Sequence, residues 1–113
     1  MKKIICVTLL SVLPVVASAY TDKTNAVIRI LNKDAGRVIE KTVRVGHSID
    51  FEKLNIHIRA CKQSDPFDAE DFFSFIEIFD GKNQVFGGWM TRNEPGQNPL
   101  QHPDYDVWLV ECN

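Results

Sequence analysis

Apolar and polar residues alternate along most of the chain with the two-residue period of β-strands. The clearest alternation covers residues 54–61, where every second residue from Leu54 to Ala60 is apolar and Cys61 falls on the polar face. On this pattern we expect Cys61 at the rim of the fold and not in its core. Residues 72–79 are apolar on both faces, which predicts a central strand that is covered on both sides.

Shorter β-rich runs, separated by turn residues at intervals of about 10 positions, predict the rest of the fold. The predicted strands are residues 26–31, 37–45, 49–51, 54–61, 72–79, 84–90 and 107–112. Residues 20–24 are expected to be a flexible lead, and residues 91–103 a loop rich in proline. Gly87-Gly88 predicts a bulge or a close approach of another group. The pattern is typical of an all-β fold, a small antiparallel β-sandwich or partly closed barrel of about seven strands.

The first 19 residues have the pattern of a cleavable secretory signal. Two lysines precede an apolar run over residues 4–16, and Ala17-Ser18-Ala19 provides a cleavage site. The run is too short to span a bilayer as a helix, and no later segment is apolar enough to do so. We therefore expect cleavage after Ala19, a periplasmic protein, and a single β domain over residues 20–113.

Export would leave the domain with two of the three cysteines, because Cys6 lies within the signal. In an oxidising compartment Cys61 and Cys112 allow one disulfide pairing. Closing the long loop between them stabilises a fold by about 4 kcal/mol in the chain-entropy treatment. Two free thiols or a metal pair are the alternatives, and the absence of a CxxC spacing speaks against a metal. No cofactor is expected.

The net charge of the domain argues against polyanionic partners. The chain has 13 basic and 15 acidic residues, and loss of the two lysines of the signal leaves the domain with 11 against 15. A net charge of −4 without a basic stripe does not suit nucleic acid or an anionic membrane. We expect no nucleic-acid partner, no membrane span, and a monomer.

One segment near the C-terminus combines residue types that can do chemistry. His102 lies close to Asp104 and Asp106, a set that can hold a metal or support acid–base catalysis. The structural interpretation is a rigid turn fixed by Pro103, with His102 at the surface and packed on Tyr105. The chain has no GxSxG, HExxH or phosphate-loop motif, and we expect a protein that is not an enzyme.

Aromatic residues are numerous enough to fill a small core or to line a binding groove. Tyr105 and Trp108 are expected to be buried. Trp89 is the main candidate for an exposed binding residue, because the two glycines before it allow a close approach. The candidate binding residues are Trp89, His102, Tyr105 and Trp108.

The acidic stretch 62–71 is typical of an exposed loop. Its carboxylates could also coordinate calcium, although they lack the order of an EF-hand loop. These residues are Asp65, Asp68, Glu70 and Asp71.

The chain resembles an uncharacterised family of short secreted alphaproteobacterial proteins that carry a domain of unknown function. The similarity lies in four motifs: H-P-D-Y-D-V-W at 102–108 ending in Cys112, V-F-G-G-W-M at 85–90, I-R-A-C at 58–61 and V-G at 45–46. It covers about residues 26–112. The resemblance implies an envelope location, a β-rich domain and a pair of cysteines, and it implies no activity.

The leading hypothesis is a non-enzymatic periplasmic binding or scaffold module that recognises an envelope component or a protein partner. One alternative is a secreted inhibitor of a host or competitor enzyme, which would act through a projecting loop at 93–99. A further alternative is a metal-binding or hydrolytic protein that uses His102, Asp104 and Asp106.

Overall fold

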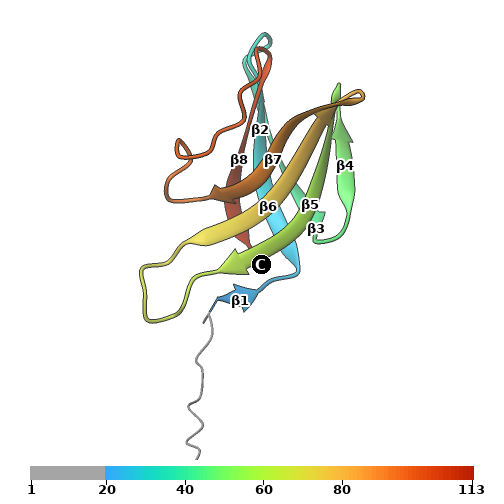
Figure 1. Cartoon of the computed structure of the whole chain (residues 1–113). Coiled ribbons are helices and arrows are strands. Elements are labelled where there is room, and N and C mark those ends of the chain that lie inside the picture. The colour runs from blue at the N-terminus through green and yellow to red at the C-terminus, as the bar shows by residue number, and fades with distance from the viewer. Residues whose placement is uncertain (1–19) are drawn as a thin grey trace, which may run out of the picture.

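The computed structural model describes residues 20–113, which form eight β-strands in two antiparallel sheets (Figure 1). The strands are β1 (Thr21–Asp22), β2 (Asn25–Asn32), β3 (Arg37–Arg44), β4 (Ser48–Phe51), β5 (Leu54–Gln63), β6 (Phe72–Asp80), β7 (Asn83–Thr91) and β8 (Tyr105–Cys112). The all-β prediction is confirmed. Within residues 20–113 no helix is long and apolar enough to cross a membrane. The expected secretory signal and Cys6 lie outside the described residues.

Seven of the eight strands correspond to the predicted ones, and the additional strand lies in the segment expected to be a flexible lead. In β1, Thr21 pairs with Gln63 and Asp22 with Lys62, both on β5. The N–H of Lys23 also donates to the carbonyl of Cys61 over 2.8 Å. The prediction of a flexible lead is therefore wrong, because these backbone groups are used to extend the sheet.

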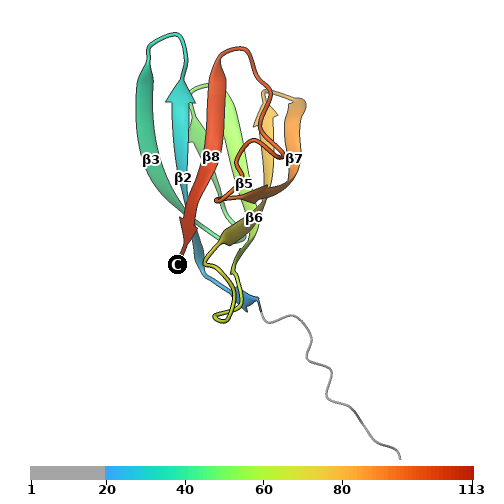
Figure 2. The same ribbon diagram turned by 90° about the vertical axis from the view of Figure 1, so that its left-hand side faces the viewer.

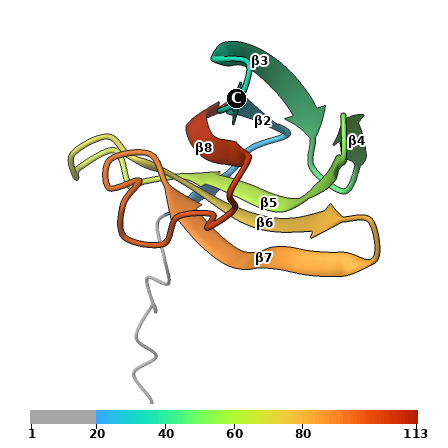
Figure 3. The ribbon, with the colours of Figure 1, turned by 90° about the horizontal axis from the view of Figure 1, so that it is seen from above.

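The two sheets pack face to face, as the view from above shows (Figure 3). In the five-stranded sheet the order is β1-β5-β6-β7, and β4 also pairs with β5. In the three-stranded sheet β2 lies between β3 and β8 (Figure 2). The segment that connects β7 to β8 runs along the side of the molecule between these two edge strands (Figures 2 and 3).

The core lies between the sheets and is formed by alternate residues of the long strands. Its fully buried members include Ile28 and Ile30 of β2, Ile56 and Ile58 of β5, Ile76 and Ile78 of β6, and Leu109 of β8. Each such side chain contributes about 1.5–3 kcal/mol through its burial. The one fully buried polar side chain among them, Ser74, donates from Oγ to the carbonyl of Ala60 over 2.7 Å, so its hydroxyl is satisfied.

A β-bulge in β5 reverses the predicted direction of Cys61. Ile58 pairs with Ile76, but Ala60 pairs with Phe75, which leaves Arg59 as the extra residue. Arg59 remains on the surface and binds Glu77 over 2.6 Å. After the bulge the alternation is shifted by one residue, and Cys61 faces the core with 2% of its surface exposed. The rim position expected for Cys61 is wrong for this reason.

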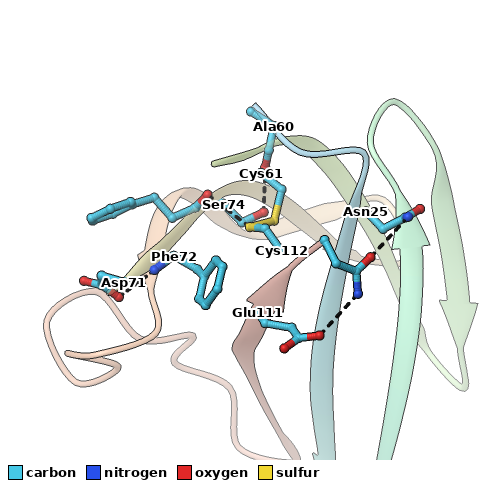
Figure 4. The surroundings of a disulfide bond; sticks show 10 residues. Asn25, Ala60, Cys61, Asp71, Phe72, Ser74, Glu111 and Cys112 are labelled. Carbon is cyan, nitrogen blue, oxygen red and sulfur yellow. Dashed lines mark hydrogen bonds between the residues drawn. A yellow bond between two sulfur atoms is a disulfide. The ribbon is translucent and has the colours of Figure 1, made fainter. Parts of the chain in front are cut away.

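Cys61 and Cys112 form the predicted disulfide, with their Cα atoms 5.6 Å apart (Figure 4). Because Cys61 belongs to β5 and Cys112 to β8, the bond joins the two sheets through the core. It lies at the end of the sandwich where β2 begins, since Cys112 pairs with Ala26.

Candidate functional site

The outer face of the five-stranded sheet carries a row of half-buried aromatic side chains. In β6, Phe73, Phe75 and Phe79 alternate with core residues and therefore point away from the second sheet. Each contacts the ring of a neighbouring residue: Tyr20 stacks on Phe73 with 5.2 Å between ring centroids, Trp89 meets Phe75 edge-on at 5.4 Å, and His57 meets Phe79 edge-on at 5.5 Å. The second face of β6 is thus only partly covered, by side chains and not by another layer, which corrects the expectation of cover on both sides.

A small apolar hollow of about 190 Å³ lies at one end of this row, lined by Tyr20, Lys62, Phe73 and Trp89. Tyr20 and Trp89 are 49% and 43% exposed. The ammonium group of Lys62 binds Asp22 over 3.0 Å, so its aliphatic stem contributes to the wall of the hollow.

Phe67 is the most exposed large apolar side chain of residues 20–113, at 95%. It belongs to the loop between β5 and β6, whose first and last residues are two positions along the chain from Lys62 and Phe73 of the hollow. We call Tyr20, Lys62, Phe67, Phe73 and Trp89 the aromatic end of the five-stranded sheet.

Hydrogen bonds hold the loop that carries Phe67 in one conformation. The buried hydroxyl of Ser64 donates to the carbonyl of Ala69 over 3.0 Å and accepts from the N–H of Asp71 over 2.9 Å. Asp65 accepts from the N–H of Phe67 over 2.8 Å. The prediction of an exposed loop is correct, but sequence reasoning missed its apolar tip. The available signal was a phenylalanine within an otherwise polar run.

Three of the four carboxylates of this loop that could coordinate calcium bind protein groups instead. Asp65 and Asp71 accept backbone N–H groups, and Glu70 binds Arg92 over 3.0 Å. In the part of the chain that the structure describes, no group of three or more His, Cys, Asp or Glu residues is placed to hold a metal ion.

The two glycines before Trp89 predict a close approach of another group, and the structure shows one at Gly88. A Cβ atom on Gly88 would lie 2.9 Å from Nδ2 of Asn98. This nitrogen donates to the carbonyl of Trp89 over 3.1 Å. The approaching group therefore comes from the loop between β7 and β8, and the bond ties that loop to an edge strand.

His102 is buried, with 6% of its side chain exposed. Its Nδ1 accepts from the N–H of Asp104 over 3.0 Å, so Nε2 carries the proton that is donated to Asp80 over 2.9 Å. The ring also packs on Tyr105, with 5.2 Å between centroids. The expected contact with Tyr105 is present, but the expected surface position is wrong, because the loop folds back onto Asp80 at the end of β6.

Tyr105 is also buried, and its hydroxyl donates to Glu52 over 2.9 Å. Glu52 further accepts from Asn32 over 2.8 Å and from Arg37 over 3.1 Å. Glu52 lies in the tight turn between β4 and β5, which explains its φ of 54°, an unusual value for a residue other than glycine. Burial raises the pKa of Tyr105, and the hydrogen bond to Glu52 raises it further. Tyr105 and Glu52 therefore connect the two sheets at the end opposite the disulfide.

Asp104 and Asp106 do not join His102 in a common centre. Asp106 binds Lys33 over 3.6 Å, and Lys33 also donates to the carbonyl of His102 over 2.9 Å. Trp108 is half-buried, so the expected full burial is wrong. It lines a second hollow of about 270 Å³ together with Pro95, Gly96, Pro99, Leu100, Asp106 and Val107. Of the four candidate binding residues, Trp89 is exposed and Trp108 half-buried, whereas His102 and Tyr105 are buried.

Comparisons with known proteins give a family but no activity. A family model described as "Uncharacterized protein conserved in bacteria (DUF2155)" matches residues 26–112. Among curated proteins the chain is similar to "Uncharacterized protein RP359" of Rickettsia prowazekii (strain Madrid E), with 23% identity over 101 residues. The match covers 85% of this chain and 65% of the relative, so the chain spans about two thirds of that protein's length. No solved structure matches the chain.

Proposed function

The chain belongs to the DUF2155 family of uncharacterised bacterial proteins, and we propose that it is a non-enzymatic binding module that recognises a protein partner through the aromatic end of its five-stranded sheet. The proposed location is the periplasm. The signal pattern of the first 19 residues and the disulfide support this location, because disulfides persist in oxidising compartments.

The distribution of exposed apolar side chains carries the proposal. Four large ones are exposed in residues 20–113. Two of them, Tyr20 and Trp89, line the hollow, and a third, Phe67, is on the loop that joins β5 to β6. Single exposed apolar residues are normal on a protein surface, but a group around a hollow is typical of an interaction site. Aromatic residues are also the side chains that most often dominate the binding energy of protein interfaces.

The size of the hollow favours a protein over a small molecule. Sites for small ligands usually enclose about 300–1,000 Å³. The hollow of about 190 Å³ is smaller, and it suits one apolar side chain of a partner. Lys62 is the only charged residue of its lining, and its charge is already paired with Asp22.

Capture from a cell-envelope extract, compared between matched variants of the purified protein, tests the proposal. Trp89→Ala and Phe67→Ala remove apolar surface from the aromatic end. Val38→Ala, on the three-stranded sheet, removes a side chain of comparable exposure (51%) and is the control. We expect the same protein to be captured by the wild type and by Val38→Ala, and at least tenfold less of it by the other two variants.

Circular dichroism verifies that all three variants keep the fold. Equal capture by all of them would contradict the proposal. Retention of the wild type on purified cell-wall glycan, with loss of retention in Trp89→Ala, would instead identify a sugar as the ligand.

A further inference from the structure

β3 is an edge strand of the three-stranded sheet and is unusually open to solvent. It pairs with β2 without interruption from Asn25 opposite Arg44 to Asn32 opposite Arg37. Six of its eight residues are exposed, including Val38 at 51%. No strand of the described chain lies on its other side. A long regular edge of this kind is a template for another strand.

The backbone groups available on this edge follow from the hydrogen bonds to β2. The N–H of Val45 donates to the carbonyl of Thr24 over 2.8 Å, so the backbone of Val45 points towards β2. Because the direction alternates along an antiparallel strand, the N–H and C=O groups of Glu40, Thr42 and Arg44 point away from it. The carbonyl of Arg44 accepts the N–H of His47 and has a second lone pair.

We propose that β3 pairs with β3 of a second copy of this chain, in an antiparallel arrangement whose two-fold axis passes through Thr42. This interface is separate from the aromatic end. The register places Glu40 opposite Arg44 of the second copy, and the symmetry creates that pair twice. Arg44 makes no ion pair with any other residue of the described chain, and Glu40 has one neighbour, Arg29 at 3.1 Å.

Charge selects this register over its neighbours. An axis through Lys41 would place two lysines opposite each other, and an axis through Glu40 would do the same with two glutamates. Like charges in directly opposed positions destabilise a strand pair, whereas opposite charges and Thr–Thr pairs stabilise it. With the axis at Thr42, Lys41 faces Val43 and Ile39 faces Val45 of the second copy. These charges therefore disfavour the registers centred on Lys41 and Glu40, and a register centred on Val43 lacks the two Glu40–Arg44 pairs.

Sedimentation velocity of the purified protein over a range of concentrations tests the pairing. We expect the protein to change reversibly from monomer to dimer as its concentration rises. Arg44→Glu should weaken dimerisation by about tenfold, because two attractive pairs become repulsive. The double exchange Glu40→Arg with Arg44→Glu restores opposite charges and should recover most of the affinity. A protein that remains monomeric up to about 1 mM, the state that the sequence predicts, would overturn the proposal.

Cross-linking tests the register independently of the charges. Opposed residues at a hydrogen-bonded antiparallel position have Cα atoms about 5.5 Å apart, which suits a disulfide. Thr42→Cys should therefore form a covalent dimer on mild oxidation. Val38→Cys is the matched control on the same strand and the same face, and its two copies would lie about 26 Å apart. Equal cross-linking of the two variants, or none at Thr42→Cys while dimers persist, would overturn the register.

Discussion

The imidazole of His102 donates a hydrogen bond from Nε2 to the carboxylate of Asp80 over 2.9 Å. This bond joins the long loop before β8 to the end of β6. The segment with the most apparent catalytic potential in the sequence is thus part of the framework that closes one end of the sandwich.

The first prediction concerns this bond. His102→Ala leaves Asp80 and the N–H of Asp104 without their partner, and we expect it to lower the free energy of unfolding by about 1–3 kcal/mol. Urea denaturation followed by tryptophan fluorescence measures the change. His47→Ala, at an exposed turn position, is the control and should remain within about 0.5 kcal/mol of the wild type. If His102→Ala lowers the free energy of unfolding as little as the control does, the bond does not support the fold.

The second prediction concerns pH. The pKa of Tyr105 is raised above its ordinary value by burial and by its bond to Glu52. Below about pH 10 the phenol is protonated in both the folded and the unfolded chain, and its stabilising contribution is complete. Between that pH and the higher pKa of the folded state, only the unfolded chain has lost the proton. Stability should therefore fall as the pH rises above about 10.

Tyr105→Phe is the variant that isolates this contribution. It should be less stable than the wild type at pH 7, because it lacks the bond to Glu52, and the difference should shrink as the pH rises above about 10. Denaturation midpoints at a series of pH values give the comparison. Tyr20→Phe, which leaves Tyr105 intact, should retain the wild-type fall. A constant difference between wild type and Tyr105→Phe would contradict the assignment.

The third prediction concerns the contact between Gly88 and Asn98. A methyl group at Gly88 would lie 2.9 Å from Nδ2 of Asn98 and would displace it from the carbonyl of Trp89. Gly88→Ala and Asn98→Ala should therefore both lower the free energy of unfolding, partly through loss of the same hydrogen bond. In a double-mutant cycle we expect the combined variant to be about 1 kcal/mol more stable than the sum of the single changes predicts. Fully additive costs would show that the two residues act independently.

The fourth prediction concerns the disulfide. Replacing both Cys61 and Cys112 by Ala should lower the free energy of unfolding by about 2–5 kcal/mol. Because these residues are only 2% and 3% exposed, dithiothreitol should reduce the bond in urea but not in native buffer. Mass spectrometry after alkylation distinguishes the two states. Rapid reduction in native buffer would mean that this end of the sandwich opens readily.

Strand positions were predictable from the sequence because alternation reports which face of a strand is buried. The direction of Cys61 was not predictable, because the bulge at Arg59 shifts the alternation by one residue, and no residue type in I-R-A-C marks a bulge. β1 was missed for a related reason. Its two residues are exposed, so their pairing with β5 leaves no hydrophobic pattern.

Candidate binding residues were harder to predict than strands. Trp89 is exposed, as expected, and the expected burial of Tyr105 is confirmed. The surface position expected for His102 is wrong. The hydrogen-bond partners of His102 and Tyr105 lie 22 and 53 positions earlier in the chain, so no local pattern reveals them. Phe67 was missed because a single apolar residue within a polar loop has no period to detect.

The place of β2 between β3 and β8 sets the order in which the protein can fold. Its hairpin with β3 is local and can form early, but Ile28 pairs with Leu109, 81 positions later in the chain. Contacts of such large sequence separation form slowly, because closing the loop costs entropy before any contact offsets it. Until β8 arrives, the edge of β2 that pairs with it stays open to solvent. A chain in which β8 has not yet paired is prone to aggregate through this open edge. The yield of folded protein therefore depends on how quickly the last strand becomes available.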